Sequence, residues 1–255
     1  MTTTRPSGSL YTRIENHIAT IEFGHPASNS FPSELLARLS KEFHLLSDNS
    51  EIHIIVLKSE GDGPFCAGAS FNELVDIKTL DEGTTFFNGF AKVLNAMRQC
   101  SKLIIGRVQG KAVGGGVGLI AACDYVMATE ASAIKLSELT IGIGPFVIAP
   151  AIERKIGIAA LSELTIAAES WQNAYWAKEK GLYARVFETI KELDKEVEFL
   201  SIKLSQYNPQ ALYEMKKVLW KNTEDWDTLL DQRARISGKL VLSEFTREAL
   251  QRFKK

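Results

Sequence analysis

The chain has 255 residues, of which 45% are hydrophobic and 24% charged, and these values are ordinary for a globular protein. Its 30 basic and 31 acidic residues leave a net charge of -1, which argues against the basic surface that nucleic-acid binding requires. Because the sequence has neither a run of about 18 apolar residues nor the apolar core of a signal peptide, we expect a cytoplasmic protein without a membrane span.

The cysteines and histidines limit the chemistry that the chain can carry. An odd number of cysteines without a CxxC pair predicts reduced thiols, and these are Cys66, Cys100 and Cys123. The four histidines all lie before residue 54 and lack metal-ligand spacing: His17, His25, His44 and His53. We therefore expect neither a metal site nor a Ser-His-Asp triad.

Strand and helix patterns alternate in the first part of the chain. Alternating polar and apolar residues predict a β-hairpin over Tyr11–Phe23, with its turn at Glu15, Asn16 and His17. Apolar residues at helical spacing predict an amphipathic helix over Pro32–Leu46, and Ile52–Leu57 is a short apolar strand.

The alternation continues to about Val186. We expect a helix over Thr85–Arg98, a strand over Leu103–Val108, and a helix from Gly114 through Cys123. Two further strands follow, at Tyr125–Ala128 and Ala133–Leu136. This order predicts α/β architecture.

From Lys191 onward the chain reads as helices, separated at Asn208-Pro209 and at Asn222-Thr223. No low-complexity linker precedes this part. We therefore expect a core over residues 1–190 and a helical section over residues 191–255 that form one functional unit.

The glycine run Gly114–Gly116 is the first segment with chemical content. It lies between an apolar strand and an apolar helix, where free backbone N–H groups can bind an oxyanion or a phosphate. A tight strand-to-helix turn with close packing explains the glycines equally well. The loop Phe65–Ala69 is also rich in small residues, which suit either close approach to a ligand or a simple connection.

Glu138 lies among apolar residues, and Gly142 and Pro145 follow it. Apolar surroundings raise the pKa of a carboxyl group, which suits proton transfer near neutral pH. Taken alone, this residue fits an N-capping or salt-bridged glutamate at least as well.

Together, the segments resemble the crotonase (enoyl-CoA hydratase/isomerase) superfamily. Val108–Leu119 is similar to its glycine signature, Phe65–Ala69 to its first oxyanion loop, and Cys123-Asp124 to the pair that ends its central helix. Glu138 resembles its catalytic acid, and Ser243–Glu248 its final helix. The order and spacing agree from about Tyr11 to Phe253.

This resemblance implies a fold and a set of site residues. The fold is a spiral of ββα units with a C-terminal helical section that forms homotrimers, often paired into hexamers. The backbone N–H groups of Ala69 and Gly115 would bind the thioester oxygen, and Glu138 would transfer the proton. The other residues expected at the substrate are Ala67, Gly68, Gly116, Gly118, Pro145 and Phe146.

One position departs from the hydratases of that superfamily. They carry a first glutamate two residues after the glycine triplet, where this chain has Gly118. A single carboxylate suits moving one proton between two carbons better than adding water. The apolar run Phe146–Ile152 replaces a glycine-rich stretch and indicates a hydrophobic acyl pocket, and Ser70 stands where an Asp is frequent.

Three hypotheses remain open: an enoyl-CoA isomerase with Glu138 as its single acid, an enoyl-CoA hydratase, and a non-catalytic acyl-CoA binder. The hydratase, for which one candidate substrate is of the methylglutaconyl-CoA type, would need a second group such as Glu73 or Asp76. Coenzyme A would be part of the substrate, without a separate cofactor or metal. Lys239 or Lys254 would contact its phosphates.

Overall fold

The structure, a computed structural model, describes residues 7–253. A six-stranded sheet with the order β1-β2-β3-β4-β6-β8 forms its centre. Its strands are β1 (Ser9–Glu15), β2 (Ile18–Gly24), β3 (Ile54–Ser59), β4 (Leu103–Val108), β6 (Tyr125–Thr129) and β8 (Arg185–Phe187). Only the β1–β2 pair of this sheet is antiparallel. A second, parallel sheet pairs β5 (Ala112–Val113) with β7 (Ile134–Lys135).

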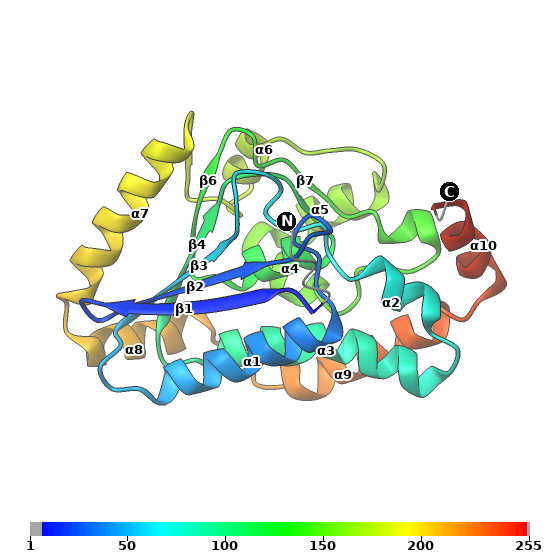
Figure 1. The fold of residues 1–255 in the computed structure, drawn as a ribbon, viewed down its shortest axis with the longest axis horizontal. Helices are drawn as coiled ribbons and strands as arrows, with labels where there is room; N and C mark the ends of the chain where they lie inside the picture. The colour runs from blue at the N-terminus through cyan, green and yellow to red at the C-terminus, as the bar shows by residue number, and fades with distance from the viewer. Residues whose placement is uncertain (1–6, 254–255) are drawn as a thin grey trace, which may run out of the picture.

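Helices cover both faces of the large sheet. Figure 1 shows α1 (Ser33–Asp48), α3 (Leu80–Gln99) and α9 (Trp226–Leu240) running side by side beneath the sheet, apart from α7 (Ile190–Ser205). In β3, Ile55 and Leu57 join the main core, whereas Ile54 and Val56 pack with residues of α7. Burial on both faces explains why Ile54–Leu57 of this strand form an unbroken apolar run.

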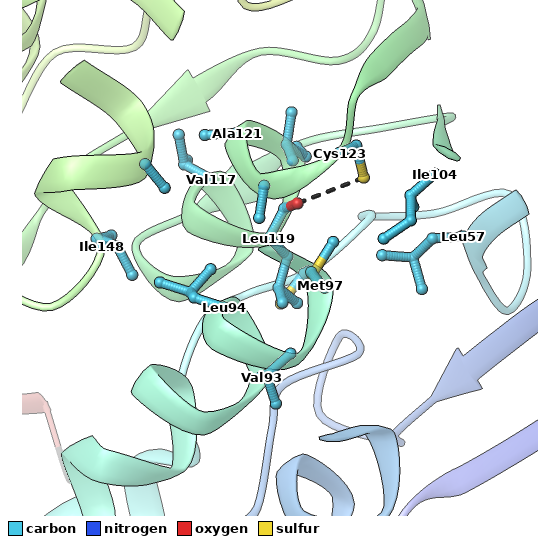
Figure 2. Packing of buried hydrophobic residues seen from close by; sticks show 14 of the residues in the cluster. Leu57, Val93, Leu94, Met97, Ile104, Val117, Leu119, Ala121, Cys123 and Ile148 are labelled. Carbon is cyan, nitrogen blue, oxygen red and sulfur yellow. Dashed lines mark hydrogen bonds between the residues drawn. The ribbon is translucent and has the colours of Figure 1, made fainter. Parts of the chain in front are cut away.

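The short helix α4 (Gly115–Ala122) lies in the middle of the main core, and all its residues after Gly115 are buried. Figure 2 shows its Val117 and Leu119 among Leu94 and Met97 of α3 and Ile148, which precedes α5 (Ala149–Ile166). A helix surrounded by apolar neighbours can be apolar on every side, as this one is.

Local capping fixes where the longer helices begin. Thr79 and Glu82 form a capping box at α3, and Thr189 and Glu192 form one at α7. Asn208 caps α8 (Pro209–Leu219). The remaining helices are α2 (Phe71–Asp76), α6 (Ala174–Glu179), α10 (Glu244–Phe253) and the 3-10 helix η1 (Glu138–Ile141).

The structure confirms the predicted hairpin, and Asn16 and His17 form its turn with φ of 51° and 65°. Two helix predictions were incomplete. The helix predicted from Thr85 begins at Leu80 because Thr79 caps it there, and α2 was not predicted. The predicted strand Ala133–Leu136 contains only two paired residues.

The predicted boundary between core and helical section falls at the first residue of α7. The helices beyond it are not separate from the core, since α9 packs along α3 and α7 covers the sheet. Gly83 of α3 is so close to α9 that a Cβ on it would lie 2.9 Å from the Cα of Gly238.

Within residues 7–253, no helix is both long and apolar enough to cross a membrane. Nor do three His, Cys, Asp or Glu side chains gather as metal ligands in this part of the chain. The three cysteines are free and buried, and burial raises the pKa of the Cys66 and Cys123 thiols to about 12.

Candidate active site

A cavity of about 340 Å³ opens where the small-residue loop, the β5–α4 turn and η1 meet helices α2, α3 and α9. Of the predicted site residues, it brings together Ala67, Gly68, Ala69, Gly115, Glu138, Pro145 and Phe146. The rest of its wall is mainly apolar, with Phe71, Leu74, Phe87, Phe90, Ile141, Ile143, Val147 and Ile148. These walls suit an acyl chain.

The backbone of Ala69 has an N–H free to bind a ligand at this cavity. On either side of it, the Gly68 carbonyl accepts from the Phe31 N–H at 2.8 Å and the Ser70 N–H donates to the Phe31 carbonyl at 2.9 Å. Because backbone groups alternate in extended chain, the Ala69 N–H is directed away from Phe31. It has no hydrogen-bond partner among the described residues.

The N–H of Gly115 is the second free donor. Gly115 is the first residue of α4, so its N–H has no carbonyl one turn earlier, and no other described residue accepts from it. Gly114 before it has φ of 52°, a conformation in which glycine is strongly preferred. The helix N-terminus also adds partial positive charge at this point.

Backbone contacts hold the two donors close together. The Cys66 carbonyl accepts from the Val113 N–H at 2.9 Å, which ties the loop to β5. Gly68 has φ of 88°, and a Cβ on it would lie 3.0 Å from the Val113 carbonyl oxygen and 3.6 Å from the Gly115 nitrogen. The glycine therefore permits an approach that a larger residue would prevent.

Glu138, at the start of η1, faces the same turn. Its Oε1 would lie 2.7 Å from a Cβ on Gly114, and its Oε2 is buried without a hydrogen-bond partner among the described residues. Desolvation raises the pKa of Glu138 to about 7. Such a carboxyl can both accept and return a proton near neutral pH.

Gly116 and Gly118 were expected at the substrate, and the structure places both behind the cavity wall. A Cβ on Gly116 would lie 2.7 Å from the Cβ of Cys66, and one on Gly118 would lie 2.4 Å from the Cγ2 of Ile148. The side chain of Ile148 thus covers the position of the missing first glutamate. In this structure both glycines are packing positions.

The two residues considered as a replacement for that glutamate lie elsewhere. The Glu73 carboxylate accepts from the Ser33 N–H at 2.9 Å and from the Ser33 hydroxyl, so it caps the start of α1. Asp76 is exposed at the end of α2, and neither residue lines the cavity. Ser70 caps α2 by accepting from the Glu73 N–H at 3.4 Å, which gives a structural reason for this residue.

Four polar cavity residues were not predicted from the sequence: Lys135, Ser137, Thr140 and Ser237. Lys135 of β7 is the only basic residue that lines the cavity among those described, and its Nζ lies 5.6 Å from the Trp171 ring centroid. Ser237 reaches the cavity from α9, and no sequence pattern distinguishes it from an ordinary helical serine. Lys239, expected at the phosphates, is exposed and does not line the cavity, and Lys254 lies outside the described residues.

The apolar run after Pro145 contributes to the cavity only through its first three residues. Phe146, Val147 and Ile148 line the wall, whereas α5 begins at Ala149.

Comparison with known proteins agrees with this geometry. The family model for enoyl-CoA hydratase/isomerase matches residues 13–255. The chain belongs to the enoyl-CoA hydratase/isomerase family. As the resemblance predicted, it is an enzyme of a family that acts on acyl-CoA thioesters.

Individual relatives carry both hydratase and isomerase names. The putative enoyl-CoA hydratase/isomerase YngF of Bacillus subtilis (strain 168) is 30% identical, over 96% of this chain and 94% of its own length. The peroxisomal Delta(3,5)-Delta(2,4)-dienoyl-CoA isomerase of Arabidopsis thaliana is 27% identical over 87% of this chain and 84% of its own.

A solved structure supports the predicted fold. The enoyl-CoA hydratase from Bacillus halodurans superposes with a TM-score of 0.88 at 21% identity, and the match covers 95% of this chain and 99% of that one. The crotonase-type fold is therefore confirmed for this family member.

Proposed function

We propose that this enzyme is an enoyl-CoA isomerase that moves a double bond along the acyl chain with Glu138 as its only acid–base group. The proposal rests on the position of Ile148, whose side chain fills the space beside Gly118, where a hydratase would have its first glutamate. Glu138 is the only carboxylate among the described residues that line the cavity. Because an apolar side chain occupies the place of a second carboxylate, the site lacks the pair of carboxylates that water addition would use.

The reaction needs only groups that the site contains. The Glu138 carboxylate removes a proton from C2 of a 3-enoyl-CoA, and the electron pair moves through the C3–C4 double bond and the carbonyl. The Ala69 and Gly115 N–H groups stabilise the negative charge that develops on the thioester oxygen. The Glu138 carboxyl then returns the proton to C4, which gives the conjugated 2-enoyl-CoA without loss or gain of atoms.

The first test is a paired assay of the protein and its Glu138→Gln variant. We expect a 3-enoyl-CoA to become 2-enoyl-CoA, detected by absorbance of the conjugated thioester and by an unchanged mass. The variant should lose about 10²–10⁴ in rate, the usual contribution of a positioned acid–base group. Crotonyl-CoA tests the alternative, because a product heavier by one water would establish a hydratase and contradict the isomerase.

A non-catalytic binder makes a different prediction in the same assay. It would bind acyl-CoA and turn over neither substrate, and that result would also contradict the isomerase. The buried carboxyl of Glu138 favours catalysis, since a binder gains nothing from an unpaired acid in an apolar cavity.

We further propose that the enzyme assembles as a homotrimer or homohexamer, as the family resemblance implies. Met215, Val218 and Leu219 form an exposed apolar stripe on α8. Their spacing places them on one face of the helix, where a second copy could cover them. Coenzyme A would enter as part of the substrate.

A further inference from the structure

Ser237 is a buried hydroxyl without a partner at the wall of the active-site cavity. It belongs to α9, it is only 1% exposed, and it lines the cavity. Its Oγ has no hydrogen-bond partner among the described residues. Buried polar groups in folded proteins are almost always hydrogen-bonded, so this one requires an explanation.

Packing explains the small size of Ser237 but not its hydroxyl. A serine inside a helix usually bonds to the carbonyl four residues earlier, and Ser237 does not. Helix α9 approaches α3 so closely at Gly238 that a Cβ there would lie 2.6 Å from the Thr84 nitrogen. This contact demands small residues, yet alanine would satisfy that demand without burying an unpaired oxygen.

The neighbours of Ser237 at the cavity offer it no partner either. The phenylalanine side chains that α3 contributes to the wall are apolar, as are those of α2. The charged cavity residues are Glu138, placed over Gly114, and Lys135, placed beside Trp171. The other hydroxyl groups of the wall belong to Ser137 and Thr140, and neither bonds to Ser237; the Thr140 hydroxyl donates to the Ser137 carbonyl at 2.7 Å. The missing hydrogen bond can therefore come from the molecule that fills the cavity.

We propose that the Ser237 hydroxyl selects an acyl chain that carries an uncharged oxygen group, a hydroxyl or a ketone, remote from the thioester. An uncharged group fits because a buried carboxylate would need a cation, and Lys135, the only basic residue of the described cavity lining, lies on β7 beside the Trp171 ring. The inference rests on the proposed function, since it takes the cavity to be the acyl pocket. A chain with such a group satisfies Ser237, whereas a plain alkyl chain leaves it unpaired.

The test is isothermal titration calorimetry with saturated acyl-CoA thioesters, which have no double bond to move and therefore bind without turning over. The probes are hexanoyl-CoA and octanoyl-CoA, each compared with the ester that has a ketone on its penultimate carbon. The proteins are the wild type, Ser237→Ala and Ser201→Ala. Ser201 of α7 is the matched control, because it is 2% exposed, has no hydrogen-bond partner for its Oγ among the described residues, and lies outside the cavity.

We expect the wild type and Ser201→Ala to bind at least one of the two keto-acyl-CoA thioesters roughly three- to tenfold more tightly than the acyl-CoA of the same length without the ketone. In Ser237→Ala that ratio should fall to about one, while the alkyl esters bind as before. A ratio near one in the wild type would overturn the proposal, as would a preference that survives Ser237→Ala.

Binding of hexanoyl-CoA and octanoyl-CoA shows whether a negative result counts against the role of Ser237 alone or also against the proposed isomerase function. If the wild type binds no ester at all, both fail, because the cavity is then not an acyl pocket. If the alkyl esters bind and the isomerase assay succeeds without any oxo preference, only the role of Ser237 fails. A thermal melt of each variant verifies that it is folded.

Discussion

At the scale of single residues, the role proposed for Glu138 predicts how the reaction depends on pH. Its carboxyl must be ionised to remove a proton, and burial raises its pKa to about 7. We therefore expect kcat/KM with a 3-enoyl-CoA to rise about tenfold per pH unit below pH 7 and to level off above it. A profile that is flat between pH 5 and 8 would show that another group, or an unshifted carboxyl, performs the proton transfer.

Gly118 and Ile148 provide a second prediction at this scale. A glycine in an open helix usually becomes more stable on substitution by alanine, by about 0.5–1 kcal/mol. Here the new Cβ would lie 2.4 Å from the Ile148 Cγ2, so we expect Gly118→Ala to lower the free energy of unfolding by about 1–3 kcal/mol.

A double-mutant cycle with Ile148→Gly isolates this contact, because it removes both the Cγ2 and the Cβ, which lie 2.4 Å and 2.7 Å from the Cβ position of Gly118. In that background Gly118→Ala should be less costly by about 1 kcal/mol, measured by denaturant unfolding. Equal costs in both backgrounds would mean that Ile148 does not occupy the space beside Gly118.

The segments that meet at the cavity could be predicted from the sequence, but its far wall could not. Glu138, Ala69 and Gly115 lie in short segments whose small residues and order are visible along the chain. The closure of the Gly118 position by Ile148 depends on how α5 packs on α4, across 30 residues of chain. Ser237 comes from a helix about a hundred residues after η1, and periodicity alone does not place it at the cavity.

At the scale of elements, η1 holds Glu138 and is itself held by α10. Gly142 ends η1 with φ of 79°, and its N–H donates to the Glu138 and Leu139 carbonyls. A Cβ on Gly142 would lie 2.5 Å from the Phe245 ring and 2.7 Å from the Thr246 Oγ1 of α10. The position of the Glu138 carboxyl thus depends on a contact between two elements far apart in the sequence.

Gly142→Ala should therefore reduce both stability and kcat. The left-handed backbone costs a non-glycine residue about 1–2 kcal/mol, and the clash with α10 adds to this cost. Gly61→Ala is the matched control, because Gly61 has φ of 75° and nothing within 4 Å of its Cβ position. Equal losses of stability in the two variants, with unchanged kcat, would show that α10 does not position η1.

The elements themselves were predictable where local signals decide them. The hairpin turn at Asn16-His17 and the start of α8 at Asn208-Pro209 are set by residues beside each boundary. Helix α2 is only six residues long, too short to show helical periodicity, and β7 pairs over two residues. Such elements exist because tertiary neighbours hold them, which a single segment does not reveal.

At the scale of the whole molecule, the exposed stripe on α8 predicts how copies associate. Val218 is 57% exposed, with Met215 and Leu219 beside it on the same helix face. We expect native mass spectrometry at micromolar concentration to show three or six times the chain mass of 28.3 kDa. Val218→Glu should convert that assembly to monomers, because a charge buried in an apolar interface is left unpaired.

The control for this experiment is Leu45→Glu, which places the same charge at an exposed apolar residue of α1. It should leave the assembly intact, and circular dichroism should show both variants folded. A monomeric wild type would contradict the trimer and hexamer alike. An assembly unchanged by Val218→Glu would move the interface away from α8, and the exposed apolar residues of other helices would then be the surfaces to test.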